Sequence, residues 1–254
     1  MGVSEGLDRE RGRRDERQQL KMHLPEAPSE YLEGALDNGE LGPEELVLLL
    51  RSPASTAAIV ARVGTNRSWM RSRELKVAFV GHPHAPRVLA RRFLPHLSWR
   101  DLADLGTKPR ISPVMRREAE RLLKTRLPEL SAGEKISLAR RASRGIIEML
   151  RDEQDPQVLR ALAGNPRAVE SDILRILARP DLRSEFLAWL ADQSSWGQRR
   201  ELRLALVRHP GTPPPAALRS IRALSRADLH DLQQDPLAPR LARVAAERRL
   251  ARVG

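Results

Sequence analysis

Histidine residues are the first place to look for chemistry in this chain. His82 and His84 form a His-x-His pair, and His209 occupies the place of His82 in a second copy of the surrounding segment. Imidazole nitrogens bind Zn²⁺, but such a site needs at least three protein ligands with supporting hydrogen bonds. Gly211 replaces His84 in the second copy, and no His-Glu-x-x-His sequence occurs. We therefore expect polar turn or capping residues here and no metal site.

Paired carboxylates occur in a repeated Asp-Leu-x-Asp-Leu sequence. Asp101 and Asp104 in one copy correspond to Asp228 and Asp231 in the other. Two carboxylates three residues apart on a helix can share acid–base work. However, Asp101 and Asp228 each stand three residues after the serine of a Leu-Ser pair, which is the pattern of a capping box at a helix start. We interpret these carboxylates as structural and predict no catalytic residue.

Other catalytic patterns are missing from the sequence. The chain has no cysteine, which excludes disulfides, thiolate nucleophiles and Cys-ligated metals. It has no glycine-rich phosphate loop and no Gly-x-Ser-x-Gly sequence. Its three Phe, one Tyr and four Trp are too few for a platform that stacks nucleobases. Trp69 and Trp196 are at equivalent positions before a predicted helix, which favours core packing. No cofactor is expected.

Recurrent basic residues are the main binding candidates. They occupy five pairs of equivalent positions in the two copies: Arg73, Lys76, Arg92, Arg116 and Arg121 match Arg200, Arg203, Arg219, Arg243 and Arg248. Because equivalent positions in a repeat array face the same way, we predict two basic strips that bind a phosphate backbone or an acidic peptide. The alternative is a solvated helix face with i,i+4 pairs such as Arg116–Glu120. Both interpretations stay open.

The distribution of charge supports an acidic partner. Net charge is +12, but residues 1–45 carry −6 and residues 46–254 carry +18. Such a surface attracts an acidic protein segment or nucleic acid. Arg outnumbers Lys 40 to 5, which a genomic coding bias would also produce. The longest apolar run, 46–50, is too short for a bilayer, and residues 1–20 lack a signal-peptide core. We expect a cytoplasmic protein without a membrane partner.

The elements that position these residues are short helices in a duplicated array. Residues 74–123 align with 201–250 without a gap, and 21 of the 50 positions are identical. No stretch alternates apolar and polar residues, whereas helical spacing recurs throughout. The 19 prolines fall at the edges of predicted short helices. Capping boxes are predicted at three Leu-Ser-x-x-acid sequences: 97–101, 130–134 and 224–228.

A second recurring pattern places a polar residue before proline after an apolar stretch. We predict this polar residue as a helix N-cap and the proline as the first helical residue. The predicted caps are Ser52, His82, Asn165 and His209. Pro53 and Trp69 lie closer together in the sequence than Pro166 and Trp196 do, and we interpret the excess in the second copy as an extra helix within 179–193.

The predicted fold is an all-α solenoid of short α and 3-10 helices with an internal duplication. Residues 1–27, with their mixed charge, are predicted to form a disordered tail. Residues 28–252 are predicted to form a single solenoid. Its half-repeats span about 44–123 and 157–250, joined by a repeat at 124–156.

The sequence pattern Leu-Ala-x-Asn-Pro, followed by Thr-Pro-x-x-x-Leu, resembles variant leucine-rich repeats and the HEAT-like repeats of bacteria. The residues that carry it are 78–86, 161–168 and 205–213, and the resemblance covers roughly 44–250. It implies a curved superhelix that presents a concave binding surface. Together with the recurrent arginines, we expect a non-enzymatic binding module for an acidic protein segment or nucleic acid. The cysteine cluster of some variant repeats is missing here, so no metal cluster is carried over.

The same resemblance implies an alternative function. Some HEAT-like proteins are alkylpurine DNA glycosylases, which bind damaged bases with Trp, Asp and a basic concave face. In this chain Trp99 beside Asp101 is the place where such a site would lie. Arg226 replaces this Trp in the second copy, so the site would be single.

Overall fold

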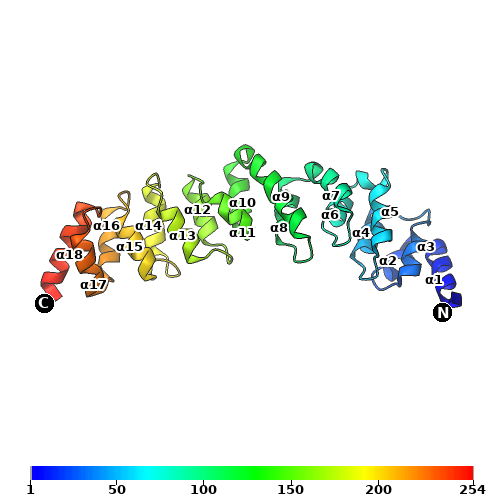
Figure 1. Cartoon of the computed structure of the whole chain (residues 1–254), viewed down its shortest axis with the longest axis horizontal. Coiled ribbons are helices and arrows are strands. Elements are labelled where there is room, and N and C mark those ends of the chain that lie inside the picture. Colours follow the sequence, from blue (N-terminus) through cyan, green and yellow to red (C-terminus); the bar gives the residue numbers. More distant parts are fainter. Residues whose placement is uncertain (1, 254) are drawn as a thin grey trace. The chain divides into compact units, whose positions relative to one another are not determined.

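The chain folds into helices, as the sequence predicts. The computed structural model describes residues 2–253, and this part of the chain contains eighteen α-helices, three 3-10 segments and no strand (Figure 1). All α-helices except α1, α9 and α18 are short, and the longest of these short helices, α10, has 10 residues. The fold is therefore an all-α, solenoid-like array. The helices group into two compact units, residues 1–128 and 129–254, where the prediction has one array over 28–252.

Unit 1 (residues 1–128) has nine α-helices and two 3-10 segments within its described residues. They are α1 (Gly2–Arg14), α2 (Arg17–His23), α3 (Ser29–Ala35), α4 (Pro43–Arg51), α5 (Ala57–Thr65), η1 (Trp69–Arg71), α6 (Arg73–Val80), α7 (Arg87–Phe93), η2 (Leu94–His96), α8 (Trp99–Thr107) and α9 (Pro113–Arg126). A third segment, η3 (Leu127–Glu129), lies at the end of the unit.

Unit 2 (residues 129–254) again has nine α-helices in its described part. They are α10 (Ala132–Arg141), α11 (Arg144–Leu150), α12 (Pro156–Ala163), α13 (Glu170–Leu177), α14 (Ser184–Asp192), α15 (Arg200–Arg208), α16 (Pro214–Arg222), α17 (Arg226–Gln234) and α18 (Arg240–Val253).

The duplication extends over the whole of both units. Helices α2, α5, α8 and α9 recur residue for residue as α11, α14, α17 and α18, all at one constant shift along the chain. The predicted extra helix is therefore wrong, because α14 is the counterpart of α5. Pro53 corresponds to Pro180 rather than Pro166, so no insertion separates the copies. The predicted connecting repeat at 124–156 is not a separate element. The boundary between the units falls inside it, after residue 128, and α10 and α11 are the first α-helices of unit 2.

The predicted capping boxes are confirmed at all three serines. Ser98, Ser131 and Ser225 each cap a helix, and the acid three residues later bonds back to the serine N–H. This reciprocal arrangement satisfies two backbone donors that the helix itself leaves without partners. Local sequence alone therefore sets the starts of α8, α10 and α17.

The predicted N-caps before proline are wrong. Ser52, His82, Asn165 and His209 instead open β-turns after the ends of α4, α6, α12 and α15. In each turn the side chain accepts the backbone N–H two residues later, and the carbonyl accepts the N–H three residues later. Proline is favoured next because its fixed φ suits the second position of a turn. The prediction that these histidines are polar turn residues is confirmed.

The predicted disordered tail is replaced by two helices, α1 and α2. Asn38, which is buried, donates from Nδ2 to the carbonyls of Gly12 at 3.1 Å and Asp15 at 2.8 Å. The Asp15 carboxylate in turn accepts from the Tyr31 hydroxyl and lies 2.9 Å from His23 Nδ1. These contacts hold the segment that the composition alone assigns to disorder. Asn165 repeats the arrangement in unit 2 with the carbonyls of Ala139 and Ala142.

Helix α1 also packs closely against α3 through two glycines. A Cβ added at Gly34 would collide with the Arg9 carbonyl oxygen, and one at Gly12 would collide with that of Tyr31. These neighbours are backbone atoms, so the helices would have to separate. Gly6, on the same helix as Gly12, has no such neighbour.

We expect Gly34→Ala to loosen α1 from α3 and to destabilise unit 1 by about 1–3 kcal/mol, because overpacking outweighs the roughly 1 kcal/mol gain in helix propensity. Hydrogen exchange of the amides in α1, together with thermal unfolding, measures this. Gly6→Ala is the control and should leave exchange unchanged or slower. Unchanged exchange in Gly34→Ala would contradict close packing of the two helices.

Buried carboxylates connect helices across successive repeats. They are the third residues of α4, α8, α13 and α17, namely Glu45, Asp101, Asp172 and Asp228. Each accepts the N–H of its own N-cap residue and the guanidinium of an arginine 28 residues earlier. The arginines are the first residues of α2, α6, α11 and α15, namely Arg17, Arg73, Arg144 and Arg200. We call these four pairs the Arg–acid ladder.

Candidate anion-binding pocket

The ten residues of the predicted basic strips have the same solvent exposure in the two copies. Six are exposed and four are half-buried, and each residue of unit 1 has the exposure of its counterpart in unit 2. The exposed ones are Arg73, Arg92, Arg121, Arg200, Arg219 and Arg248. The half-buried ones are Lys76, Arg116, Arg203 and Arg243. The duplication is thus preserved in burial as well as in residue type.

Several strip residues have intramolecular partners. Arg73 and Arg200 belong to the Arg–acid ladder, Arg121 pairs with Glu118, and Arg219 pairs with Asp192. Among the half-buried members, the Lys76 ammonium donates to the Arg71 carbonyl and Arg116 to the Lys108 carbonyl. Arg203 bridges the carbonyls of Gly197 and Ala223. At Arg73 and Arg200 the partner recurs as well, so recurrence of this pair reflects a structural role shared by both copies.

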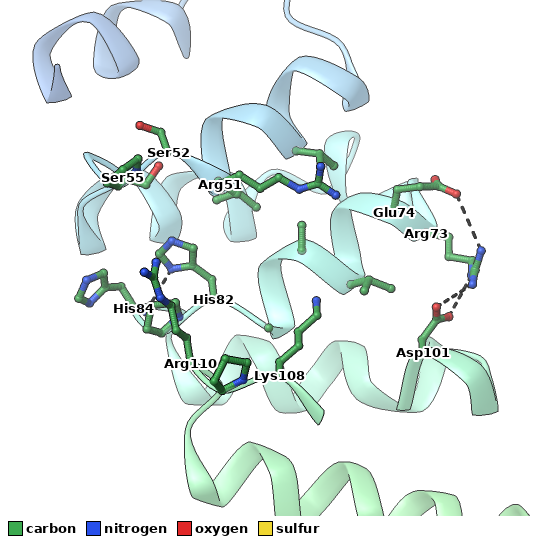
Figure 2. A pocket seen from close by; sticks show the side chains of 18 residues that line it. Arg51, Ser52, Ser55, Arg73, Glu74, His82, His84, Asp101, Lys108 and Arg110 are labelled. Carbon is green, nitrogen blue, oxygen red and sulfur yellow. Dashed lines mark hydrogen bonds and ion pairs between the residues drawn. The ribbon is translucent and has the colours of Figure 1, made fainter. Parts of the chain in front are cut away.

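A different set of basic residues surrounds a pocket in unit 1. The pocket has a volume of about 630 Å³ and lies among α4, α6, the turn at 81–84 and the segment 108–110 after α8 (Figure 2). Its apolar wall comes mainly from Val47, Leu50, Val77 and Ala78. Of the ten predicted strip residues, Arg73 alone lines it.

The cations of this pocket come from segments that are distant in the sequence. Arg51 is the last residue of α4, Lys108 is the C-cap of α8, and Arg110 follows two residues later. In Figure 2, Arg51 and Lys108 extend toward the same space from opposite sides, and Arg110 lies beside His82 and His84. Within residues 2–253 none of these three cations makes a side-chain hydrogen bond or an ion pair. We call Arg51, Lys108 and Arg110 the cation cluster.

The environment of Lys108 is unfavourable for its own charge. Burial lowers the pKa of Lys108, and the positive charge of Arg51 lowers it further, while Asp104 and Asp101 act in the opposite direction. A half-buried ammonium near a second cation gains stability when an anion enters. The pocket is therefore electrostatically prepared for a negatively charged group.

His82 adds a neutral donor to the pocket. Burial, with a smaller contribution from His84, lowers the pKa of His82 to about 4, so its imidazole is uncharged at neutral pH. Its Nδ1 accepts the backbone N–H of His84 at 3.1 Å. The neutral ring then carries its proton on Nε2, where it can donate to a ligand oxygen.

Asp101 marks the far side of the pocket and is already engaged. Its carboxylate accepts from Arg73 Nε at 2.9 Å, Arg73 Nη2 at 2.6 Å and the Ser98 hydroxyl at 2.7 Å. Burial raises the pKa of Asp101, but the hydrogen bonds from Arg73 and Ser98 outweigh it and hold the pKa below its usual value. The structural role predicted for Asp101 is confirmed. The ring of Trp99, the aromatic residue near Asp101, is occupied by a cation: its centroid lies 5.2 Å from Cζ of Arg100.

Unit 2 lacks the cation cluster. The counterparts of Arg51, Lys108 and Arg110 are Ala178, Asp235 and Leu237. Asp235 pairs with Arg208, which occupies the place of Gly81. Arg179, which occupies the place of Ser52, donates from Nη1 to the carbonyl oxygens of Arg151 at 2.6 Å and Glu153 at 2.8 Å.

The corresponding hollow in unit 2 is also smaller, about 320 Å³. His209, the counterpart of His82, is buried there and bonds through Nε2 to the Arg179 carbonyl at 2.7 Å. One copy of the duplication thus has an open basic pocket, whereas in the other the hollow is smaller and Asp235 and Arg179 are engaged in internal contacts.

No family model, no curated protein and no solved structure matches this chain. Across residues 2–253, no group of three His, Cys, Asp or Glu side chains is placed to hold a metal ion. No helix in that range has the length and apolar character needed to span a bilayer. The fold and the pocket define an all-α repeat protein with one basic pocket in its first unit.

The cation cluster was not predicted from the sequence, because the predicted basic strips comprise only positions that recur in both copies. Arg51, Lys108 and Arg110 do not recur, and Arg51 is far from the other two along the chain. The available signal was the difference between copies: at these positions an ungapped comparison of the two halves sets cations against Ala, Asp and Leu.

Proposed function

We propose that this protein is a non-enzymatic binding module of the α-solenoid type, related to HEAT-like or variant leucine-rich repeats, which recognises an acidic partner through unit 1. The observation that carries the proposal is the cation cluster: three cations that line one pocket and make no ion pair or side-chain hydrogen bond in the described structure. Charges placed in this way are available to a ligand, whereas those of the Arg–acid ladder are not.

The charge around the pocket supports the same function. Residues 51–127 contain 17 Lys and Arg against 5 Asp and Glu, while the equivalent residues 178–254 contain 14 against 8. A concave site with one sign of charge and partly apolar walls concentrates ligands of the opposite sign. Of the predicted strip residues, Arg73 alone lines the pocket, and it is paired with Asp101.

The proposal is tested by binding of fluorescently labelled poly-L-glutamate across a salt series. We expect the triple variant Arg51→Glu, Lys108→Glu, Arg110→Glu to lose at least about tenfold in affinity at low salt, because like charges then face the ligand. The matched control reverses three exposed cations of unit 2: Arg175→Glu, Arg183→Glu and Arg222→Glu.

Equal losses in the two variants would show that net charge alone drives binding and would contradict a site in unit 1. Absence of binding by the wild-type protein at low salt would overturn the proposed function itself.

The alternative function, a HEAT-like DNA glycosylase, draws less support from the geometry. Such an enzyme needs a free carboxylate beside an exposed aromatic residue. Asp101 is 7% exposed in its side chain and is bonded to both Arg73 and Ser98. Release of an alkylated base from duplex DNA by the purified protein, lost in Asp101→Asn, would support the enzyme instead.

A further inference from the structure

We infer that the pocket of unit 1 receives a phosphomonoester group carried by a phosphorylated side chain of a partner protein. The inference rests on the proposed function and specifies the acidic partner. It is based on the three cations that line the pocket, on the apolar residues of the pocket wall, and on the residues that replace the cations in unit 2.

The three residues of the cation cluster line a single pocket and come from two separate parts of unit 1. Arg51 comes from the end of α4, and Lys108 and Arg110 come from the segment after α8. A phosphomonoester carries a charge of about −1.5 to −2 and three strong acceptor oxygens, so several cations can bind it at once. A carboxylate brings one charge and two oxygens, and it satisfies such a cluster less completely.

The half-buried position of Lys108 increases this preference. Its ammonium lies against Gly81, where an added Cβ would be 3.0 Å from Nζ. Burial and Arg51 lower the pKa of Lys108, and a dianion restores it by more than a monoanion does. The neutral His82 can add a hydrogen bond from Nε2 to a phosphate oxygen.

The remaining walls favour a peptide over nucleic acid. Val47, Leu50, Val77 and Ala78 offer an apolar surface beside the cations, which suits the side chains that flank a phosphorylated residue. No Phe, Tyr or Trp lines the pocket, so a nucleobase has no large aromatic ring to stack on.

The test uses three libraries of labelled peptides that share a degenerate sequence and differ in the central residue: phosphoserine, serine or glutamate. Fluorescence anisotropy with the full-length protein measures their affinities, and duplex and single-stranded oligonucleotides with the same label are measured beside them. We expect the phosphoserine library to bind at least about tenfold more tightly than the glutamate library.

Lys108→Gln should remove the difference in affinity between the phosphoserine and glutamate libraries. Arg51→Gln, at an exposed position, should reduce it without risk to the half-buried part of the pocket. Arg175→Gln in unit 2 is the control and should have no effect. Circular dichroism establishes that each variant is folded.

Three outcomes would overturn the inference. If glutamate and phosphoserine libraries bind equally and both are lost in Arg51→Gln, the proposed function stands and the phosphate specificity fails. If an oligonucleotide binds more tightly than the phosphoserine library and this also depends on Arg51, the ligand is nucleic acid. If no library or oligonucleotide binds the wild-type protein, the proposed function fails with the inference.

Discussion

Replacing Asp172 by alanine is expected to lower the free energy of unfolding by about 2–4 kcal/mol, through the loss of charged hydrogen bonds and of a helix-capping contact. The Asp172 side chain is 1% exposed and accepts from the Arg144 guanidinium and the Val169 N–H. Arg151 lies 3.6 Å away and adds a second positive charge. Removal of the carboxylate leaves the start of α13 uncapped and its link to α11 broken.

Thermal and denaturant unfolding measure this effect. The control is Asp152→Ala, an exposed aspartate of the same unit, which should change stability by less than about 0.5 kcal/mol. A loss in Asp172→Ala no greater than in the control would show that the Arg–acid ladder does not hold unit 2 together.

The same variant should respond differently to acid. Burial raises the pKa of Asp172, but the hydrogen bond from Arg144 and the other favourable contacts outweigh it, so the pKa lies below its usual value. Because the pKa is lower in the folded than in the unfolded state, the stabilisation is complete above pH about 4 and is lost as the pH falls through the folded-state value. Below pH about 4 the wild-type protein should therefore lose stability more steeply than Asp172→Ala.

Parts of this fold follow from local sequence and were predictable. The capping boxes at Ser98, Ser131 and Ser225 involve residues three apart, so the sequence contains both partners of each contact. Helix length follows from the spacing of apolar residues and the density of proline. The duplication was visible in 74–123 because identity is high there, but its extent over both complete units became clear only from the helix boundaries.

The N-cap prediction failed because proline suits two positions equally well. Its fixed φ fits both the first residue of a helix and the second residue of a β-turn. At Pro83 and Pro210 the apolar stretch precedes the proline, which places a helix end there rather than a helix start. Attention to the order of the apolar stretch and the proline would have favoured the turn.

Contacts between residues that are distant in the sequence explain the other differences between the predicted and the observed fold. Residues 1–27 have the composition of a disordered segment, but Asn38 and Tyr31 hold them from outside that segment. The predicted strips included Arg73 and Arg200 because they recur, and they recur because the Arg–acid ladder needs them. Recurrence of this pair thus reflects a contact that both copies make, whereas the cation cluster lies at positions where the copies differ.

Rebuilding the pocket in unit 2 is expected to add a second binding site and so tests this reasoning directly. The changes are Ala178→Arg, Arg179→Ser, Arg208→Gly, Asp235→Lys and Leu237→Arg, which copy the residues of unit 1. Arg208→Gly is needed because the ammonium of Lys108 lies where a Cβ at Gly81 would crowd it. Arg179→Ser removes the side chain that bonds to Arg151 and Glu153.

Titration with the phosphoserine peptide library should then change from one site per chain to two. The matched control carries the other four changes but retains Asp235, whose carboxylate would oppose an incoming anion, so it should keep a single site. A rebuilt protein that folds, as judged by circular dichroism, yet still binds one equivalent would contradict the assignment of binding to Arg51, Lys108 and Arg110. Two equivalents would show that these few positions separate a binding unit from its structural duplicate.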